Sequence, residues 1–135
     1  MPRLEKGGKW VFGWVIIDAD RCIRIPQDAW SEYGFAAEQE AFFLKGSTTS
    51  GGFGIGTKEQ ISGTIAARKL GTGGFREGRE IRIPREVDVR PWQKLLAVRG
   101  SGHALGFVAH GPIFELALRH PEIPQSLTAV AEGRL

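Results

Sequence analysis

The chain has 135 residues, of which 41% are hydrophobic and 24% charged, a balance typical of a folded globular protein rather than a disordered one. Nineteen glycines and seven prolines indicate many turns and short elements, and a single cysteine excludes internal disulfides and any zinc site made of several cysteines. No apolar run approaches the roughly 20 residues of a membrane span, and the start lacks the apolar stretch of a secretory signal. We therefore expect a cytoplasmic protein with no membrane partner.

The N-terminal part of the chain predicts a β-hairpin. Residues 10–17 are rich in aromatic and β-branched side chains and predict a strand, and the aspartates of residues 18–20 favour a turn. In the next strand Ile23 and Ile25 alternate with Arg24, so the isoleucines should face a core and the arginine should face outward.

A short helix and a further strand should follow this hairpin. Pro26 suits the first turn of a helix over residues 26–33, and Gly34 suits the left-handed position that ends a helix. Residues 40–45 then predict a strand, and residues 46–52 form a loop of glycine, serine and threonine.

Two more helices are predicted further along. Thr57 and Gln60 have the spacing of a capping box, and the helix that they open should present an apolar face. A second helix over residues 112–120 is too apolar for an exposed helix, so we expect it between two parts of the protein. Residues 121–135, with two prolines, are expected to be a tail. The apolar face of the helix that Thr57 opens comprises Ile61, Ile65 and Leu70.

An ordered set of motifs occurs twice in the chain. Residues 23–26 recur unchanged at 81–84, an offset of 58, and two later motifs recur at an offset of 54. Such recurrence indicates two versions of one ββαβ-like unit, which can pair around a pseudo-twofold axis as the subunits of a dimer do. We expect units at 10–70 and 75–122 in one shared domain, with tails at 1–9 and 123–135. The later motifs are Lys45-Gly46-Ser47 with Arg99-Gly100-Ser101, and Gly52-Phe53 with Gly106-Phe107.

The first unit resembles the swapped-hairpin DNA-binding domain of the AbrB/MazE/SpoVT family. The resemblance covers residues 14–45, with a fainter repeat at 76–101, and implies a mainly β swapped-hairpin or double-psi-like barrel with short peripheral helices. It also implies a non-enzymatic transcription regulator that binds double-stranded DNA. The matching residues are Asp18, Ile23, Ile25, Pro26, Tyr33-Gly34-Phe35 and Glu38 to Glu40.

The sequence departs from the family pattern at its basic positions. The Gly-Arg turn of the family is replaced by Arg21-Cys22 in the first unit and by Arg79-Glu80 in the second, and Gln27 and Trp30 stand where the short helix often carries basic residues. The remaining candidates for DNA contact are two related pairs, Arg21 with Arg24 and Arg79 with Arg82. A planar guanidinium suits phosphate and guanine, but strand arginines also form cross-strand ion pairs.

Basic residues are concentrated around the second of these pairs. Between Arg68 and Arg99 nine basic and four acidic residues leave a net charge of +5, against +3 for the whole chain. This excess suits a phosphate backbone as partner, although a solvated surface of mixed charge has the same composition.

Two other functions are compatible with the sequence. The two Gly-Ser loops could make the chain a barrel protein that binds a small anion or nucleotide through backbone N–H groups, although such glycines also serve ordinary turns. The other alternative is an antitoxin-like protein-interaction module that docks through helix 112–120. The sequence is also compatible with a protein partner or a homo-oligomer. The candidate anion-binding residues are Lys45, Gly46, Ser47, Arg99, Gly100 and Ser101.

Catalytic and metal chemistry find little support. The histidines are His103, His110 and His120, and no pair of them has ligand spacing with a carboxylate alongside. No nucleophile, base and acid can be assembled around them, and Cys22 beside Ile23 is expected to be a small core residue. We expect no metal, no cofactor and no enzymatic activity.

Overall fold

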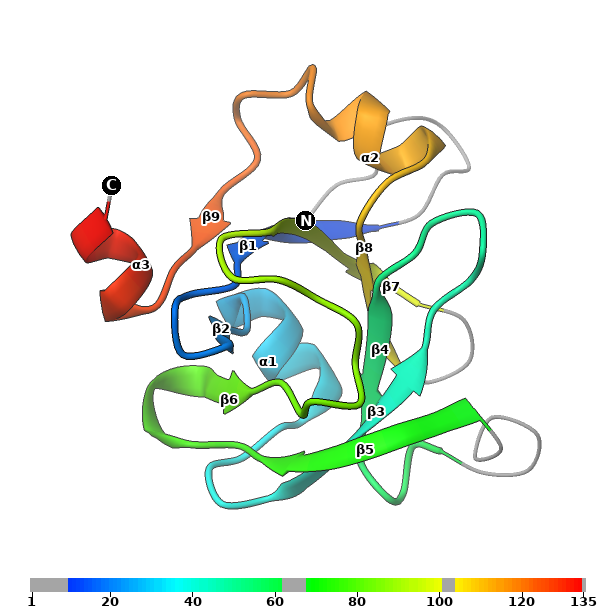
Figure 1. Cartoon of the computed structure of the whole chain (residues 1–135), viewed down its shortest axis with the longest axis vertical. Coiled ribbons are helices and arrows are strands. Elements are labelled where there is room, and N and C mark those ends of the chain that lie inside the picture. Colours follow the sequence, from blue (N-terminus) through cyan, green and yellow to red (C-terminus); the bar gives the residue numbers. More distant parts are fainter. Residues whose placement is uncertain (1–9, 62–67, 101–103, 135) are drawn as a thin grey trace.

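The computed structural model describes residues 10–61, 68–100 and 104–134. The protein is mainly β with short helices, which confirms the predicted class (Figure 1). A seven-stranded mixed sheet has the order β5-β3-β4-β8-β7-β1-β9, and β2 pairs with β6 in a separate two-stranded sheet. The strands are β1 (Val11–Ile16), β2 (Cys22–Arg24), β3 (Glu40–Lys45), β4 (Phe53–Gly56), β5 (Lys69–Gly74), β6 (Glu80–Arg82), β7 (Lys94–Arg99), β8 (Leu105–Val108) and β9 (Gln125–Ser126), and the α-helices are α1 (Gln27–Tyr33), α2 (Pro112–Ala117) and α3 (Ala129–Arg134).

The strands do not form one closed barrel in the part of the chain that the structure describes. The larger sheet remains open, with β5 and β9 at its edges. Among the described residues, the bridge that links the end of β5 to β6 is the isolated one between Arg76, just after β5, and Glu80. The physical reason is that β2 and β6 are three residues long and are soon followed by Pro26 and Pro84, whose nitrogens cannot donate to a ladder.

The pairing of the strands repeats along the chain. Ile16 of β1 lies opposite Lys94 of β7. The equivalent residues also lie opposite each other: Gly74 of β5, which is 58 positions after Ile16, faces Glu40 of β3, which is 54 positions before Lys94. Both ladders shift register at the same place, next to Phe12 in β1 and next to Leu70 in β5. The pairs β1 and β5, β2 and β6, β3 and β7, and β4 and β8 are therefore equivalent strands.

Equivalent strands also meet each other at two places. Ile23 of β2 lies opposite Ile81 of β6, and Phe53 of β4 lies opposite Phe107 of β8, so each residue faces its own counterpart. A residue can face its counterpart in an antiparallel pair only where a twofold axis passes between the two. An approximate twofold axis therefore runs through the centres of both pairs.

Unusual backbone conformations obey the same symmetry. Among the described residues, the non-glycine residues with left-handed φ are Arg21 (63°), Arg79 (61°), Glu38 (69°) and Trp92 (70°), and they form two equivalent pairs. A non-glycine side chain costs about 1 kcal/mol or more in this region, so the surrounding structure must hold each of them there. The two units thus share their strained turns as well as their strands.

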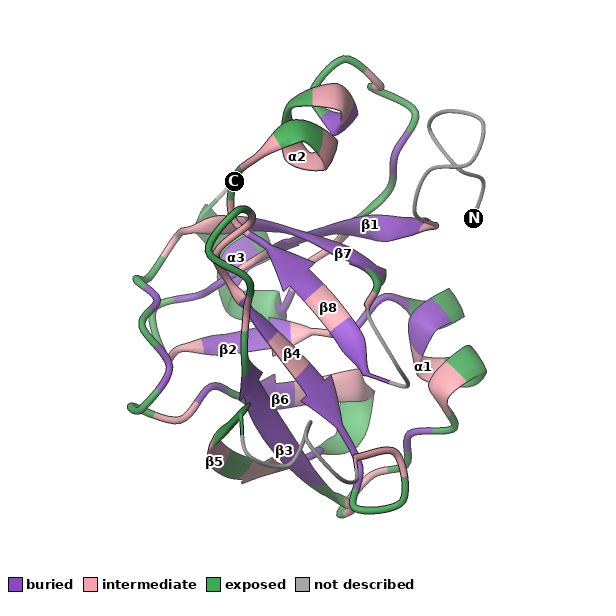
Figure 2. Ribbon diagram, turned by 90° about the vertical axis from the view of Figure 1, so that its right-hand side faces the viewer, coloured by how far each residue is buried: buried purple, intermediate pink, exposed green. Residues whose placement is uncertain are grey.

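One main core lies between the two sheets. Ile23, Ile25, Ile81 and Ile83 are at most 1% exposed and pack against aromatic and aliphatic residues of β1, β3, β4, β7 and β8. Figure 2 shows these strands as mostly buried along their length. The alternation of isoleucine with arginine therefore predicted the inward face of β2 and β6 correctly.

The first helix matches its prediction. Helix α1 spans Gln27–Tyr33 directly after Pro26, and Gly34 ends it in the left-handed conformation with φ 67° and ψ 32°. The second unit has no helix at the equivalent place, where residues after Pro84 form a turn.

The helix predicted from Thr57 is wrong at its C-terminal end. Leu70 lies in β5, which pairs with β3, because the edge of β3 satisfies the backbone of a segment with weak helical propensity. The amide of Thr57 does donate to Gln60 Oε1 at 3.0 Å, as a capping box requires. Ile65 lies outside the described residues.

The C-terminal region differs from its prediction. Helix α2 lies on the outer face of β1 of the first unit and of β7 and β8 of the second, where Ile113 and Phe114 pack against a second apolar cluster, and of its residues only Ala117 is fully buried. The helix is therefore not enclosed between the two units. The expected tail contains β9, which pairs in parallel with β1, and α3. Strand β9 forms because the edge of β1 has backbone groups that β7 does not pair. One of them, the Trp14 amide, donates to the Pro124 carbonyl just before β9.

Candidate nucleic-acid interface

The candidate site is the outer surface of β2 and β6, which we call the β2–β6 face. Because Ile23 and Ile81 point into the core, the alternating residues Cys22, Arg24, Glu80 and Arg82 point away from it. Cys22 lies opposite Arg82, and Arg24 lies opposite Glu80. Arg24 and Arg82 are equivalent residues, each one position from the Ile23–Ile81 centre on opposite strands.

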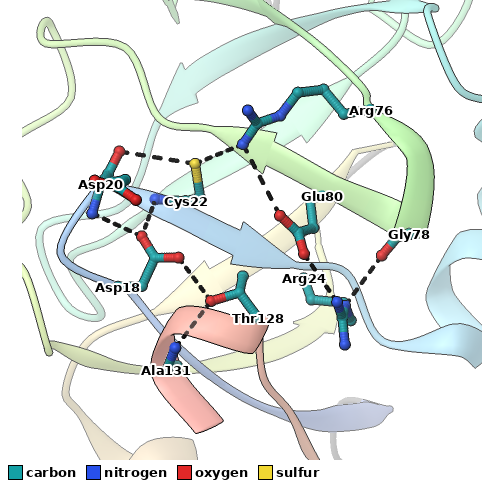
Figure 3. Close-up of polar contacts among 9 residues, drawn as sticks. All are labelled: Asp18, Asp20, Cys22, Arg24, Arg76, Gly78, Glu80, Thr128 and Ala131. Carbon is teal, nitrogen blue, oxygen red and sulfur yellow. Dashed lines mark hydrogen bonds and ion pairs between the residues drawn. The ribbon is translucent and has the colours of Figure 1, made fainter. Parts of the chain in front are cut away.

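A polar network occupies one half of this face (Figure 3). Arg24 donates to Glu80 Oε2 at 2.8 Å and to the Gly78 carbonyl at 3.1 Å. Arg76 lies 3.9 Å from Glu80 Oε1 and donates to Cys22 Sγ at 2.7 Å. A single carboxylate therefore lies between two guanidinium groups, which leaves an excess of positive charge.

The other half of the face carries Arg82. Its side chain is exposed, and the structure gives it no hydrogen bond or ion pair within the described ranges. The reason is that its cross-strand neighbour is Cys22, whereas the equivalent neighbour of Arg24 is a glutamate. Arg82 is thus the predicted DNA-contacting residue with the most accessible guanidinium group.

Arg21 has a structural role. Its guanidinium group donates to four backbone carbonyls of the second unit, those of Ile83, Pro84, Val87 and Val89, at 2.9–3.3 Å. In the first unit the corresponding segment is a helix that satisfies its own carbonyls, but the second unit has no helix there. Arg21 supplies the missing donors, which leaves little of its hydrogen-bonding capacity for a ligand.

Arg79 has the equivalent role in the first unit. Its Nε donates to the Ile25 carbonyl at 2.9 Å, as the Nε of Arg21 does to Ile83. Its Nη1 donates to Gln27 Oε1 at 3.0 Å. The structure therefore brings Arg24 and Arg82 onto one face and separates them in role from Arg21 and Arg79.

A buried polar contact anchors the turn before β2. Asp18 is 1% exposed, and its Oδ1 accepts from the amides of Asp20 and Cys22, as the expected turn requires. Its Oδ2 accepts from Thr128 Oγ1 at 2.6 Å, and the same hydroxyl accepts from the Ala131 amide at the start of α3. The sequence contains no signal for this contact, because 110 residues separate its partners.

The structure brings part of the predicted anion-binding set together. Lys45, Gly46, Ser47 and Gly100 line one pocket, whereas Arg99 is held by Glu32 of α1 at 2.5 Å. Ser101 lies outside the described residues.

The loop of residues 46–52 does not form an open nest of amides. The Ser50 amide donates to Ser47 Oγ at 3.1 Å, and the Gly51 amide donates to the Ser47 carbonyl at 2.8 Å. The Ser50 carbonyl in turn accepts from Ala109 and His110. These two amide groups therefore shape the loop and do not point to a ligand.

Two titratable groups are shifted by burial. Burial raises the pKa of the Cys22 thiol, and the Arg76 guanidinium opposes this shift in part. Burial, together with the nearby Glu32, raises the pKa of Tyr33. Both groups are thus held in their neutral forms, so Cys22 is a poor nucleophile near pH 7.

The described residues contain no cluster of three or more histidine, cysteine, aspartate or glutamate side chains that could hold a metal ion. Within the same ranges no helix has the length and apolar character needed to cross a membrane. Comparison of the chain with family models, curated proteins and solved structures found no match.

Proposed function

We propose that this protein is an AbrB-like transcription regulator that binds double-stranded DNA through the β2–β6 face. The two units in one chain take the place of the two subunits of a swapped-hairpin dimer, with the seven-stranded sheet and the β2–β6 pair forming the wall of a barrel-like fold. The carrying observation is the approximate twofold axis through the Ile23–Ile81 pair.

The symmetry supports this proposal because a DNA duplex also has local twofold symmetry. A protein whose contacts are related by a twofold axis can meet both strands of the duplex in the same way. Arg24 and Arg82 lie on either side of the axis on the β2–β6 face. Their positions correspond to those of two contacts from two subunits of a dimer.

The charges of the face support phosphate contact more than base readout. Arg24, Arg76 and Arg82 carry three positive charges, and Glu80 offsets one of them. Arg82 meets no competing acid among the described residues, so it should contribute most to phosphate binding. Arg21 is left out of the proposed interface because its donors are used within the fold.

A salt titration of DNA binding tests the proposal. Fluorescence anisotropy with labelled duplexes, measured between about 50 and 200 mM salt, should show affinity that falls linearly on logarithmic axes. Arg82→Gln should weaken binding to all duplexes and reduce the slope by about one. Glu80→Gln should strengthen binding, because it removes the only acid in the Arg24–Arg76 network.

Arg119→Gln is the matched control. Arg119 is also exposed and follows α2, a helix that lies away from β6 in Figures 1 and 2. Its removal changes the net charge by the same amount and should leave the affinity and slope nearly unchanged. The proposal is wrong if the wild-type protein binds no duplex at low salt, or if Arg82→Gln and Arg119→Gln behave alike.

A further inference from the structure

A second candidate site lies on the other side of the molecule's main core, on the outer face of β4 and β8. A cavity of about 140 Å³ opens there between the ends of β3, β4, β7 and β8. Its volume is close to the roughly 150 Å³ that accommodates a benzene molecule in a protein interior. This site is separate from the β2–β6 face and does not depend on the DNA-binding proposal.

The floor of this cavity is made of glycine. Gly54 and Gly106 lie directly opposite each other in the β4–β8 ladder, and neither has a left-handed φ that would require glycine. A Cβ at Gly54 would meet its nearest neighbour, the Leu105 carbonyl oxygen, at 3.5 Å, an ordinary contact. At Gly106 a Cβ would meet Val98 Cγ2 at 3.3 Å, so that glycine is required by local packing. Glycine weakens the middle of a strand, and its presence at Gly54, where a methyl group has room, is typical of a place where a ligand or another backbone approaches closely.

The walls of the cavity are apolar. Leu44, Val98 and Val108 lie on the same outward-facing rows as the two glycines, since their neighbours Phe43, Ala97 and Phe107 belong to the inner core. Leu44 is 3% exposed although it belongs to neither apolar cluster. A flat hydrocarbon group could therefore lie against the glycines between these side chains.

The rim of the cavity is positive. Lys45 and Arg68 are the charged residues among its described lining, and no described acid lines it. The side chain of Arg68 donates to the Lys45 carbonyl, whereas Lys45 has no ion pair in the described structure. Ser47 and Ser50 also line the cavity.

We infer that this cavity binds a small aromatic carboxylate, with the ring over Gly54 and Gly106 and the carboxylate at Lys45. An apolar floor with a cationic rim favours an amphipathic anion over either a neutral ring or a bare anion. Lys45 ends β3 opposite Phe53, on the row next to that of Leu44, so its long side chain must turn around the end of the strand for its ammonium group to pair with the carboxylate. The serine hydroxyls donate hydrogen bonds to the same carboxylate.

Binding of benzoate, measured by calorimetry and by NMR chemical-shift changes, tests this inference. Benzoate should saturate a single site and shift the amide signals of Gly54 and Gly106. Benzamide, which has the ring without the charge, and acetate, which has the charge without the ring, should each bind about tenfold or more weakly than benzoate.

Two variants locate the site. Gly54→Ala should fill the floor and weaken benzoate binding about tenfold, with little change in the far-UV circular dichroism spectrum. Lys45→Gln should weaken benzoate binding by a similar factor but leave benzamide unaffected, and Lys58→Gln, at an exposed lysine outside the cavity, is its control. No saturable binding of benzoate, equal binding of benzoate and benzamide, or equal loss in Lys45→Gln and Lys58→Gln would overturn the inference.

Discussion

Arg21 and Arg79, 58 residues apart, each donate an Nε hydrogen bond from a left-handed backbone position to an isoleucine carbonyl of the other unit. The partner of Arg21 is Ile83 and that of Arg79 is Ile25, so the two contacts are related by the same twofold axis as the strands. These arginines hold the two units together at the turns that precede β2 and β6.

The two arginines should differ in their contribution to stability. Arg21→Ala removes four hydrogen bonds and should lower the free energy of unfolding by about 2–4 kcal/mol, against about 1–2 kcal/mol for Arg79→Ala, which removes two. Arg21→Gly should be less harmful than Arg21→Ala by about 1 kcal/mol, because glycine adopts the left-handed conformation without strain. Urea denaturation measures all three, and equal costs at positions 21 and 79 would contradict the assigned roles.

Ile23 and Ile81 should be energetically equivalent and coupled. Each is fully buried at the centre of the β2–β6 pair, so Ile23→Val and Ile81→Val should each cost about 1 kcal/mol. The double variant should depart from additivity by about 0.5 kcal/mol or more, since the two side chains are direct cross-strand neighbours. Ile23→Val combined with Ile123→Val, in the separate outer cluster, should be additive. Clearly unequal single costs would argue against the symmetric placement.

The contact between Asp18 and Thr128 should control the attachment of α3. Thr128→Val keeps the shape of the side chain but leaves a buried carboxylate oxygen without its donor and removes the cap of α3, at a cost of about 2–3 kcal/mol. Hydrogen exchange at the Ala131 amide should accelerate in this variant. Ser126→Ala is the control, because the buried Ser126 hydroxyl has no hydrogen-bond partner among the described residues and its loss should cost almost nothing. If both variants unfold at the same urea concentration, the contact has no such role.

Stability should fall at alkaline pH because of Cys22. Burial raises the pKa of the folded thiol above its ordinary value of 9.0, so above that pH the unfolded chain loses a proton that the folded chain retains. Proton release from the unfolded state lowers the free energy of unfolding as the pH rises past about 9, with no effect at pH 7.

The Cys22→Ala variant isolates this effect. Tyr33 contributes in the same direction at higher pH but is present in both proteins. The stability of the variant relative to the wild type should therefore rise with pH above 9, whatever the cost of the substitution at pH 7. Parallel stability curves for the two proteins would show that the thiol titrates normally when folded.

Local patterns along the chain were sufficient for β2 and α1 of the first unit. The alternation around Arg24 predicted the buried isoleucines, and Pro26 and Gly34 predicted the limits of α1, because strand faces and helix ends follow from the chemistry of neighbouring residues. The identical motifs at 23–26 and 81–84 also predicted which strands would be equivalent.

Contacts between distant residues determined the rest. Strand β5 contains three glycines and has weak β propensity, and it is a strand because β3 offers it an unpaired edge. The side chain of Arg21 could not be assigned from sequence, since its acceptors lie 62–68 residues away and exist only because the second unit lacks a helix. An arginine has the same local signature whether it meets phosphate or a carbonyl, and only the folded arrangement of the two units separates Arg82 from Arg21.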